Sequence, residues 1–314
     1  MAGATHSRLK LKASRRSHSR TADNGNPWTG GLLIAVALAF LLLFLLLPLC
    51  SIFYEALRQG WGAYAEAFVE PAALHAIRLT LLVSAIAVPL NTVFGLCASW
   101  GIAKYEFPGK SILLSLIDLP FAVSPVISGL IYVLLFGAHG WLGPWLDSHD
   151  VQVIFAVPGI VLATVFVTFP FVARELIPAM QSQGNDEEYA ALTLGASGWQ
   201  TFCRVTLPNI KWPLFYGVIL CNARAMGEFG AVSVVSGHIR EATNTMPLHV
   251  EILYNEYNFV AAFAVASLLA LLALVTLVLK SAIELWTQRA VELPEGEREP
   301  DNPPMALAST DNPL

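Results

Sequence analysis

Six long apolar stretches, separated by shorter polar segments, set the pattern of this chain. Each approaches or exceeds the ~20 residues that a helix needs to cross ~30 Å of hydrocarbon. The stretches cover about residues 29–53, 74–103, 112–136, 153–171, 213–235 and 259–285. This pattern predicts an all-α membrane protein with six transmembrane helices.

Both ends of the chain are polar and lie outside the predicted spans. Residues 1–28 are rich in Lys and Arg and predict a basic, disordered cytoplasmic tail. Residues 291–314 are acidic and Pro-rich and predict a second disordered tail. A signal peptide is not expected, because the apolar run over 32–49 is long enough to span and no Ala-x-Ala-like site follows it. The transmembrane domain is therefore expected at residues 29–290.

The distribution of Lys and Arg predicts which side of the membrane each loop faces. Basic residues gather in the N-terminal tail, after the second span, after the fourth span and in the C-terminal flank; those after the fourth span are Arg174, Arg204 and Lys211. On the opposite side, the loop 137–150 has no Lys or Arg. The exceptions on that side are Arg58, Arg78 and Arg240. Both termini and the polar segment 185–208 are therefore expected to be cytoplasmic.

The composition agrees with a membrane protein and offers no catalytic machinery. Hydrophobic residues make up 55% of the chain and charged residues only 13%, against about 25% charged residues in a typical soluble domain. The four cysteines are scattered, without a Cys-x-x-Cys pair. The chain also lacks a His-Glu-x-x-His motif, a Gly-x-Ser-x-Gly motif and a Walker A loop. We expect no catalytic residue, no metal site, no cofactor on this chain and no nucleic-acid partner, and we expect membrane lipid around it.

The most polar long segment between apolar runs, residues 185–208, predicts a helix, a tight turn and a second helix. The Asn185–Asp186 pair can cap the first helix, and Gly195 stands where a helix ends in a left-handed residue. Ser197 to Gln200 has the Ser-x-x-Gln form of a capping box, which begins the second helix. Pro208 is expected to end that helix, because proline disfavours helical backbone at the residue before it.

The spacing within this segment resembles the EAA loop of bacterial ABC importer permeases. That signature is Glu-Ala-Ala, three residues, Gly, nine residues and Ile-x-Leu-Pro; here Tyr replaces the Glu and Val replaces the Ile, while the spacing is kept. The resemblance implies that the loop docks into a cleft on an ATPase subunit and passes its motion to the membrane helices. The residues expected to couple the chain to the ATPase are Glu188, Tyr189, Ala190, Ala191, Gly195, Leu207 and Pro208. The alternative is an ordinary cytoplasmic helical hairpin, which the capping chemistry alone favours.

Two charged residues lie within the fifth predicted span. Arg224 and Glu228 are four residues apart, so they share one face of a helix and can pair. A charge at bilayer depth costs about 2.5–3.5 kcal/mol on insertion scales, and such residues usually face a bundle interior or a water-filled path. Gly227 and Gly230 allow a bend or a close helix approach. We expect these four residues to form part of a translocation pathway or gate; an ion pair that only fixes the helix is the alternative that spacing leaves open.

The stretch from Arg224 to Gly230 resembles the Arg-x-x-Gly-Glu-[Phe/Tyr]-Gly motif of sulfate and molybdate permeases. The segments 232–241 and 245–251 are similar to the CysW-type permease subunits of sulfate/thiosulfate importers, and the similarity covers about residues 60–285. It implies the MetI-like fold of type I ABC importer permeases in a bacterial inner membrane. It further implies a pore shared with a second, related permease, two ATP-binding subunits that carry ATP and Mg, and a periplasmic sulfate/thiosulfate-binding protein.

Three alternatives remain at this point. A molybdate or tungstate permease shares the motif of the fifth span. An intramembrane enzyme would use Asp118, Arg224 and Glu228 as its polar chemistry, and a membrane scaffold would leave the loop spacing unexplained. In the third span, prolines around the Ser124–Pro125 pair are expected to break the helix. Asp118 is then either a pathway residue or a cap beside that break, and a cap is favoured because Asp before Leu-Pro commonly marks a turn.

Overall fold

The computed structural model describes residues 27–291, and all regular structure in that range is helical. The chain divides into two compact units, one ending at Cys50 and one beginning at Ser51. The first unit contains α1 (Pro27–Leu41), the π-helical turn η1 (Leu42–Leu46) and the start of α2 (Leu47–Leu57). Its large apolar side chains from Leu32 to Leu47 are exposed, as expected of a helix surrounded by lipid. The two predicted tails lie outside the described residues, except for their innermost positions.

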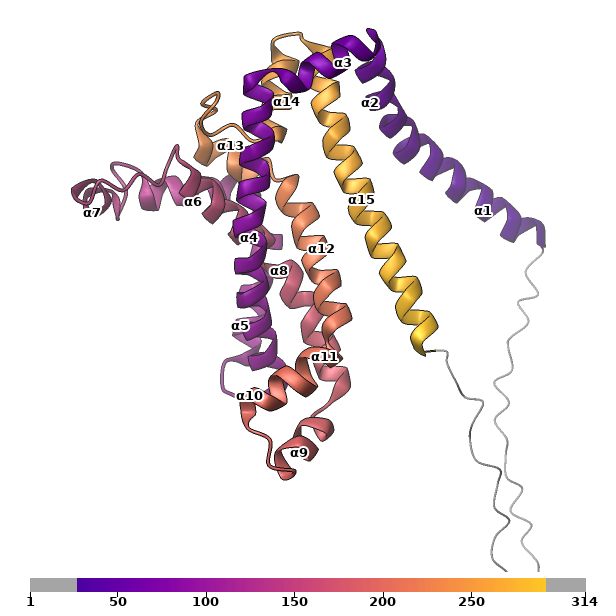
Figure 1. Ribbon diagram of the computed structural model, residues 1–314, viewed down its shortest axis with the longest axis vertical. Coiled ribbons are helices and arrows are strands. Elements are labelled where there is room, and N and C mark those ends of the chain that lie inside the picture. Colours follow the sequence, from indigo (N-terminus) through magenta and orange to yellow (C-terminus); the bar gives the residue numbers. More distant parts are fainter. Residues whose placement is uncertain (1–26, 292–314) are drawn as a thin grey trace, which may run out of the picture. The chain divides into compact units, whose positions relative to one another are not determined.

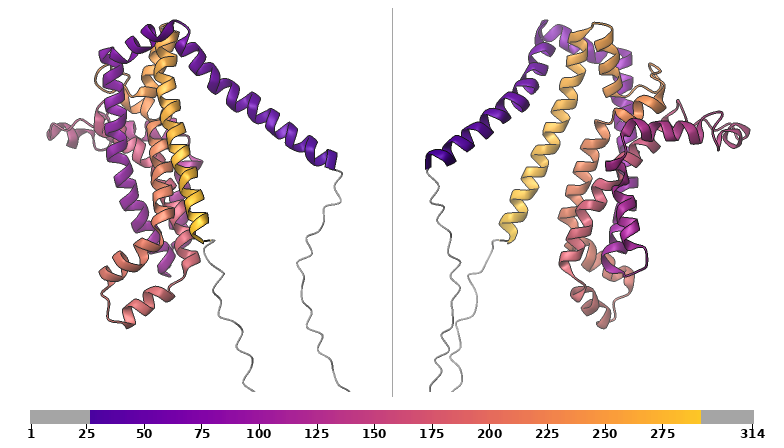
Figure 2. Two further views of the ribbon diagram at one scale, coloured as in Figure 1. Left: turned by 45° about the vertical axis from the view of Figure 1, so that its right-hand side comes forward. Right: turned by 180° about the vertical axis from the view of Figure 1, so that it is seen from behind.

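Three long helices form the centre of the second unit. They are α4 (Pro71–Lys104), α8 (Val157–Gln183) and α12 (Lys211–Met226), which pack against one another (Figure 1). The turned views of Figure 2 show the same three helices side by side. α15 (Phe259–Val291) packs along α12 and against α3 (Gly60–Val69).

α4 and α8 share the most extensive contact of these helix pairs. Asn91 Nδ2 on α4 donates a hydrogen bond to Thr168 Oγ1 on α8 at 2.7 Å. One turn further along α4, a Cβ atom on Gly95 would lie only 2.9 Å from the Cβ of Val172. Small residues and interhelical hydrogen bonds hold membrane helices together, because lipid supplies no hydrophobic drive for their association. α4 and α8 are therefore fixed to each other near the middle of their length.

Two of the predicted spans are broken. The chain bends by 105° between α5 (Lys110–Ala122) and α6 (Pro125–Phe136). It bends by 50° between α12 and α13 (Gly230–Ser236). The described chain has four helices long and apolar enough to cross a membrane, and up to six spans if each bent pair counts as one. This agrees with the six spans predicted. The break expected in the third span is present, at Val123–Ser124, whereas Pro120 lies inside α5.

The two ends of the helix bundle in the second unit differ. At one end, the polar segment between α8 and α12 forms four short elements (Figure 1). These are α9 (Asp186–Thr193), α10 (Gly198–Thr201), the π-helical turn η2 (Phe202–Thr206) and α11 (Leu207–Asn209). At the other end, α14 (Met246–Asn255) packs against α4 and α15. The sites predicted from the sequence therefore fall in two places: this loop and the break between α12 and α13.

Candidate functional site

The loop between α8 and α12 has the predicted helix–turn–helix form. Gly195 follows α9 with a φ of +88°, in the left-handed region that favours glycine. Ser197 N donates to Gln200 Oε1 at 2.9 Å, and Gln200 N donates to Ser197 Oγ at 3.3 Å. This is the predicted capping box, and it satisfies two N–H groups that the start of α10 would otherwise leave unpaired.

Two local details differ from the prediction. Asn185 precedes α9 without a side-chain cap bond, so the first turn relies on its acidic residues, which favour the positive end of the helix dipole. Pro208 does not end the second helix, because the chain widens into η2 and then continues as α11 to Asn209. In η2, Leu207 N donates to Phe202 O. This wider turn shifts the backbone pairing and so accommodates a proline ring that would clash with the carbonyl four residues earlier in an α-helix.

Two acidic side chains of α9 fasten it to other segments. Glu188 Oε1 accepts a hydrogen bond from Thr206 Oγ1 at 2.6 Å and lies 3.1 Å from Lys104 Nζ at the end of α4. Glu187 accepts a hydrogen bond from the Asn209 side chain. The Glu188 side chain is only 17% exposed, so its carboxylate faces the chain's own helices.

Three large apolar side chains of the loop are exposed. Tyr189, Leu194 and Trp199 are 60%, 88% and 74% exposed. Exposed apolar side chains gathered in one segment are typical of interaction sites. Tyr189, which stands at the position of the signature Glu, thus points away from the bundle while its neighbour Glu188 points into it.

The other residues predicted for coupling lie in the same loop. Ala190, Gly195 and Pro208 are exposed, and Ala191 is partly buried. Leu207 is partly buried and packs against the apolar cluster around the ends of α8 and α12. The structure therefore brings all seven residues together, with exposed positions on the outer face and Leu207 and Glu188 on the inner one.

The four residues predicted for a pathway or gate surround the break between α12 and α13. Arg224 lies in the last turn of α12, and Gly227 follows that helix. Glu228 Oε1 accepts a hydrogen bond from Ala231 N at 2.9 Å, and its Oε2 lies 2.6 Å from Arg224 Nη1. The second contact is ionic rather than an aligned hydrogen bond. The Glu228 side chain is 1% exposed, and this buried carboxylate both contacts Arg224 and accepts from the first turn of α13. The two residues were expected on one face of a helix, but Glu228 lies beyond the end of α12.

Gly230 brings this break against the break in the third span. A Cβ atom on Gly230 would lie 2.9 Å from the Cβ of Pro125, the first residue of α6. On the next turn of α6, a Cβ atom on Gly129 would lie 2.7 Å from the Ala231 carbonyl oxygen. α6 and α13 can therefore approach this closely only because both positions are glycine. Sequence reasoning assigned Pro125 to a helix break but did not place it, or Gly129, at this site; the signal was a small residue in an otherwise apolar run.

Asp118 is not a helix cap, which corrects the expectation for the third span. It lies inside α5, where Arg174 Nε donates to its Oδ1 at 2.8 Å and Arg174 Nη2 donates to its Oδ2 at 3.4 Å. The Arg174 guanidinium also lies 4.8 Å from the centre of the Phe121 ring. Arg174 itself lies within α8, which continues to Gln183, and not in the loop where the count of basic residues placed it. An ion pair between two helices thus took the place of the local turn that Asp-Leu-Pro suggests.

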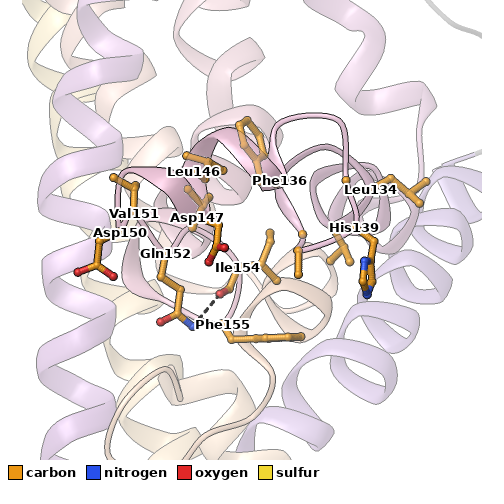
Figure 3. Close-up of a pocket in the computed structure, with 16 residues that line it drawn as sticks. Leu134, Phe136, His139, Leu146, Asp147, Asp150, Val151, Gln152, Ile154 and Phe155 are labelled. Atoms are coloured by element: carbon orange, nitrogen blue, oxygen red, sulfur yellow. Dashed lines mark hydrogen bonds between the residues drawn. The ribbon is translucent and has the colours of Figure 1, made fainter.

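A pocket of about 550 Å³ lies away from both sites, between the end of α6, the short helix α7 (Gly143–Ser148) and the segment 150–155 (Figure 3). Gln152 Nε2 donates to Ile154 O at 3.3 Å beside it. Its lining includes the carboxylates of Asp147 and Asp150 and no Lys or Arg. Carboxylates repel an oxyanion, so this pocket does not suit the cargo that the sequence resemblance implies. None of the residues predicted from the sequence lines it.

The sequence matches several transport proteins along most of its length. It is 56% identical to the sulfate transport system permease protein CysW of Synechocystis sp., over 82% of this chain and 93% of that protein. It is 52% identical to the protein of the same name from Escherichia coli K12, over 82% of this chain and 88% of that protein. The sulfate transport system permease protein CysT of Escherichia coli K12 is 37% identical, over 78% and 88% of the two chains.

The fold also matches a solved structure. One chain of a bacterial alginate ABC transporter, in complex with an alginate pentasaccharide-bound periplasmic protein, superposes with a TM-score of 0.68 over 84% of this chain and 96% of that chain. At 17% sequence identity, this likeness shows the fold alone. Residues 91–289 match the family described as binding-protein-dependent transport system inner membrane component. The chain therefore belongs to that family of ABC importer permeases.

Proposed function

We propose that this chain is a permease subunit of an ATP-driven importer of sulfate or thiosulfate, and that it forms half of the translocation pore. The observation that carries the proposal is the identity of 52–56% to proteins named as sulfate transport permeases, over most of both chains. The molybdate alternative is not favoured, because these relatives are named for sulfate. The enzyme and scaffold alternatives are not favoured either, because the relatives are named as transport permeases.

The loop between α8 and α12 is the surface that meets an ATP-binding subunit. Its exposed apolar face, with Tyr189, Leu194 and Trp199, supports this assignment, since such a face is unfavourable in water. ATP and Mg bind to that partner. The loop and both chain termini face the cytoplasm, as the distribution of basic residues predicts.

The pore is completed by a second, related permease. The similarity of this chain to two differently named permeases, CysW and CysT, supports a heterodimer of two such subunits. Two ATP-binding subunits and a periplasmic sulfate/thiosulfate-binding protein complete the importer. The binding protein approaches the end of the bundle that carries α14, opposite the loop.

Transport follows alternating access, and the break between α12 and α13 is the gate. Movement of the loop reaches α12 directly through α11, because only Ile210 separates the two helices. Arg224 lies at the far end of α12 and is held by Glu228. When α12 moves, the ionic contact and the bond from Ala231 N to Glu228 are the interactions that must stretch or change partners. The positive charge of Arg224 offsets part of the lost hydration of an anion passing the gate.

Uptake of radiolabelled sulfate by proteoliposomes that hold the full complex tests the substrate. We expect ATP-dependent uptake that excess thiosulfate competes and molybdate does not. Competition by molybdate alone would reassign the substrate class, and the absence of ATP-dependent uptake of either oxyanion would overturn the proposal.

A matched pair of glycine variants tests the loop. Gly195→Val forces a β-branched residue into a left-handed conformation, which costs about 1–2 kcal/mol or more and lowers the population of the correct turn about 5- to 30-fold. Gly198→Val is the control, because that glycine has ordinary backbone angles and open space around its Cβ position. We expect Gly195→Val to reduce uptake in assembled complexes and Gly198→Val to leave it near the wild-type rate. Equal rates for the two variants would argue against the assignment of the loop.

A further inference from the structure

Lys104 ends α4, and its ammonium group is almost enclosed. The side chain is 6% exposed, and its Nζ donates to the Gly184 carbonyl oxygen at 2.6 Å and lies 3.1 Å from Glu188 Oε1. An enclosed ammonium group is costly unless it is paired and hydrogen-bonded. Both partners of Lys104 belong to the start of the loop, so this one charge holds the start of the loop to α4.

The same Glu188 oxygen also fixes the second half of the loop. Thr206 Oγ1 donates to it at 2.6 Å, and Thr206 is 2% exposed at the end of η2. Three segments therefore meet at a single carboxylate oxygen: the end of α4, the first turn of α9 and the end of η2. A displacement of α9 cannot leave Lys104 in place without breaking one of these short contacts.

α4 carries such a displacement to the far end of the bundle. Its middle is fixed to α8 by the Asn91–Thr168 hydrogen bond and the close approach of Gly95 to Val172. Near its other end, Thr80 Oγ1 accepts a hydrogen bond from Met246 N, at the start of α14. One continuous helix thus connects the loop to α14. Lys104 is its charged contact with the loop, and the Trp100 ring, 5.2 Å from the Phe202 ring of η2, is an apolar one.

We propose that Lys104 is the positioning residue through which movement of the loop reaches α4, and that Glu188 serves this internal contact while Tyr189 faces the ATPase. This inference rests on the proposed function of the loop. The inference gives different roles to two neighbouring residues of the motif. Glu188 contacts Lys104 at the end of a membrane helix, and the exposed Tyr189 contacts the partner. It also gives α4 a direct connection to the loop, besides the covalent connections through α8 and α12.

The test compares Lys104→Met with Lys110→Met in the complete importer. Lys110 is the matched control, because it pairs at 2.7 Å with an exposed residue of its own neighbourhood, Glu106, and joins no distant segments. We expect Lys104→Met to lower the ratio of sulfate transported to ATP hydrolysed by about tenfold, the scale of losing a charge-assisted hydrogen bond. ATP hydrolysis itself should continue, since Tyr189 and the outer face of the loop are unchanged. Lys110→Met should keep the wild-type ratio, and a wild-type ratio in Lys104→Met would overturn the inference.

Two further variants separate positioning from simple folding. Lys104→Arg keeps a cation and should restore most of the coupling ratio. Glu188→Gln keeps an acceptor for Thr206 but removes the charge that pairs with Lys104, so it should uncouple the complex in the same way. The double variant Lys104→Met, Glu188→Gln should be no worse than either single variant, because both remove one contact. Additive losses of the coupling ratio would show that the two residues act separately and would contradict the inference. If the Lys104→Met complex fails to assemble, the coupling ratio of Glu188→Gln decides the inference alone.

A measurement without any substrate distinguishes this inference from the proposed function. Hydrogen exchange of the amides in residues 98–104 should change when the wild-type complex binds a nonhydrolysable ATP analogue. We expect that change to be lost in Lys104→Met and kept in Lys110→Met. If the wild-type complex imports neither sulfate nor thiosulfate, the substrate is wrong, yet the exchange result still decides the role of Lys104. An unchanged nucleotide response in Lys104→Met would refute it.

Discussion

The chain bends by 105° between α5 and α6, whereas it bends by only 50° between α12 and α13. At the first break, Val123 and Ser124 both have ψ of 133°, which is extended backbone. At the second break, Gly227 has ψ of 11° and Phe229 has ψ of −52°, so neither of these two residues is extended. The sharper bend is therefore the one that has two extended residues.

The two breaks also differ in what holds them. Pro125 follows the first break, and proline biases the residue before it towards extended backbone. A charged side chain holds the second: Glu228 accepts from Ala231 N and contacts Arg224. The proline ring therefore biases the first bend in addition to its packing, and the second bend is held by contacts that can be exchanged. This contrast is why we place the gate at the second break, and four sets of variants test it.

The largest effect is expected at Glu228. Glu228→Ala removes both the cap of α13 and the partner of Arg224. Breaking a buried ion pair costs about 3–5 kcal/mol of stability. We expect a loss towards the lower end of that range, because the Arg224 side chain is partly exposed. Glu228→Gln keeps an acceptor for Ala231 N and should cost less. Thermal unfolding of the complex in detergent measures both. Equal losses for the two variants would show that the cap contributes nothing.

The next effect is expected at Gly129, where the two broken spans meet. A Cβ atom there would lie 2.7 Å from a backbone oxygen, which cannot rotate away, so Gly129→Ala should destabilise the fold by about 1–3 kcal/mol. Gly227→Ala is the control, because the nearest atom to its Cβ would be at 3.6 Å. The same unfolding measurement should show no comparable loss for the control. A loss at Gly227 as large as at Gly129 would mean that backbone freedom, and not close packing, matters at this junction.

Gly230→Ala should have a smaller effect than Gly129→Ala. Its Cβ would lie 2.9 Å from the Cβ of Pro125, a side-chain atom and slightly farther away than the backbone oxygen at Gly129, so we expect a cost of about 1 kcal/mol. Sulfate uptake should fall more than the melting temperature suggests, because the substitution lies at the proposed gate. Normal uptake together with lowered stability would move the gate elsewhere.

The smallest effect is expected for Pro125→Ala. The substitution removes the steric bias on Ser124 and adds conformational freedom to the unfolded chain, at a cost of about 0.4–1 kcal/mol. The bend should persist, because α6 is also held by its packing against α13. Spin labels at the exposed positions Ile112 and Leu134 would report the angle as a distance. A large increase in that distance would show that the proline alone sets the bend.

Features that depend on neighbours in the sequence were predictable. Six spans follow from the length of the apolar runs. The capping box from Ser197 to Gln200 and the left-handed Gly195 follow from turn chemistry, which acts over a few residues. Arg224 and Glu228 are four residues apart and in contact, although Glu228 lies just beyond the end of α12. In each case the interacting groups are brought together by the local geometry of one helix or turn.

Contacts between distant segments were decided by the tertiary structure. Asp118 and Arg174 are 56 residues apart, and their pairing overrode the local preference of Asp-Leu-Pro for a turn. The enclosure of Lys104 by Gly184 and Glu188, and the contact of Gly230 with Pro125, likewise depend on which helices lie side by side. The alternation of apolar and polar residues determines that a helix spans the membrane, but it does not determine which neighbour each face meets. That choice is made by close packing and hydrogen bonding between whole helices, and these form only once the chain is assembled.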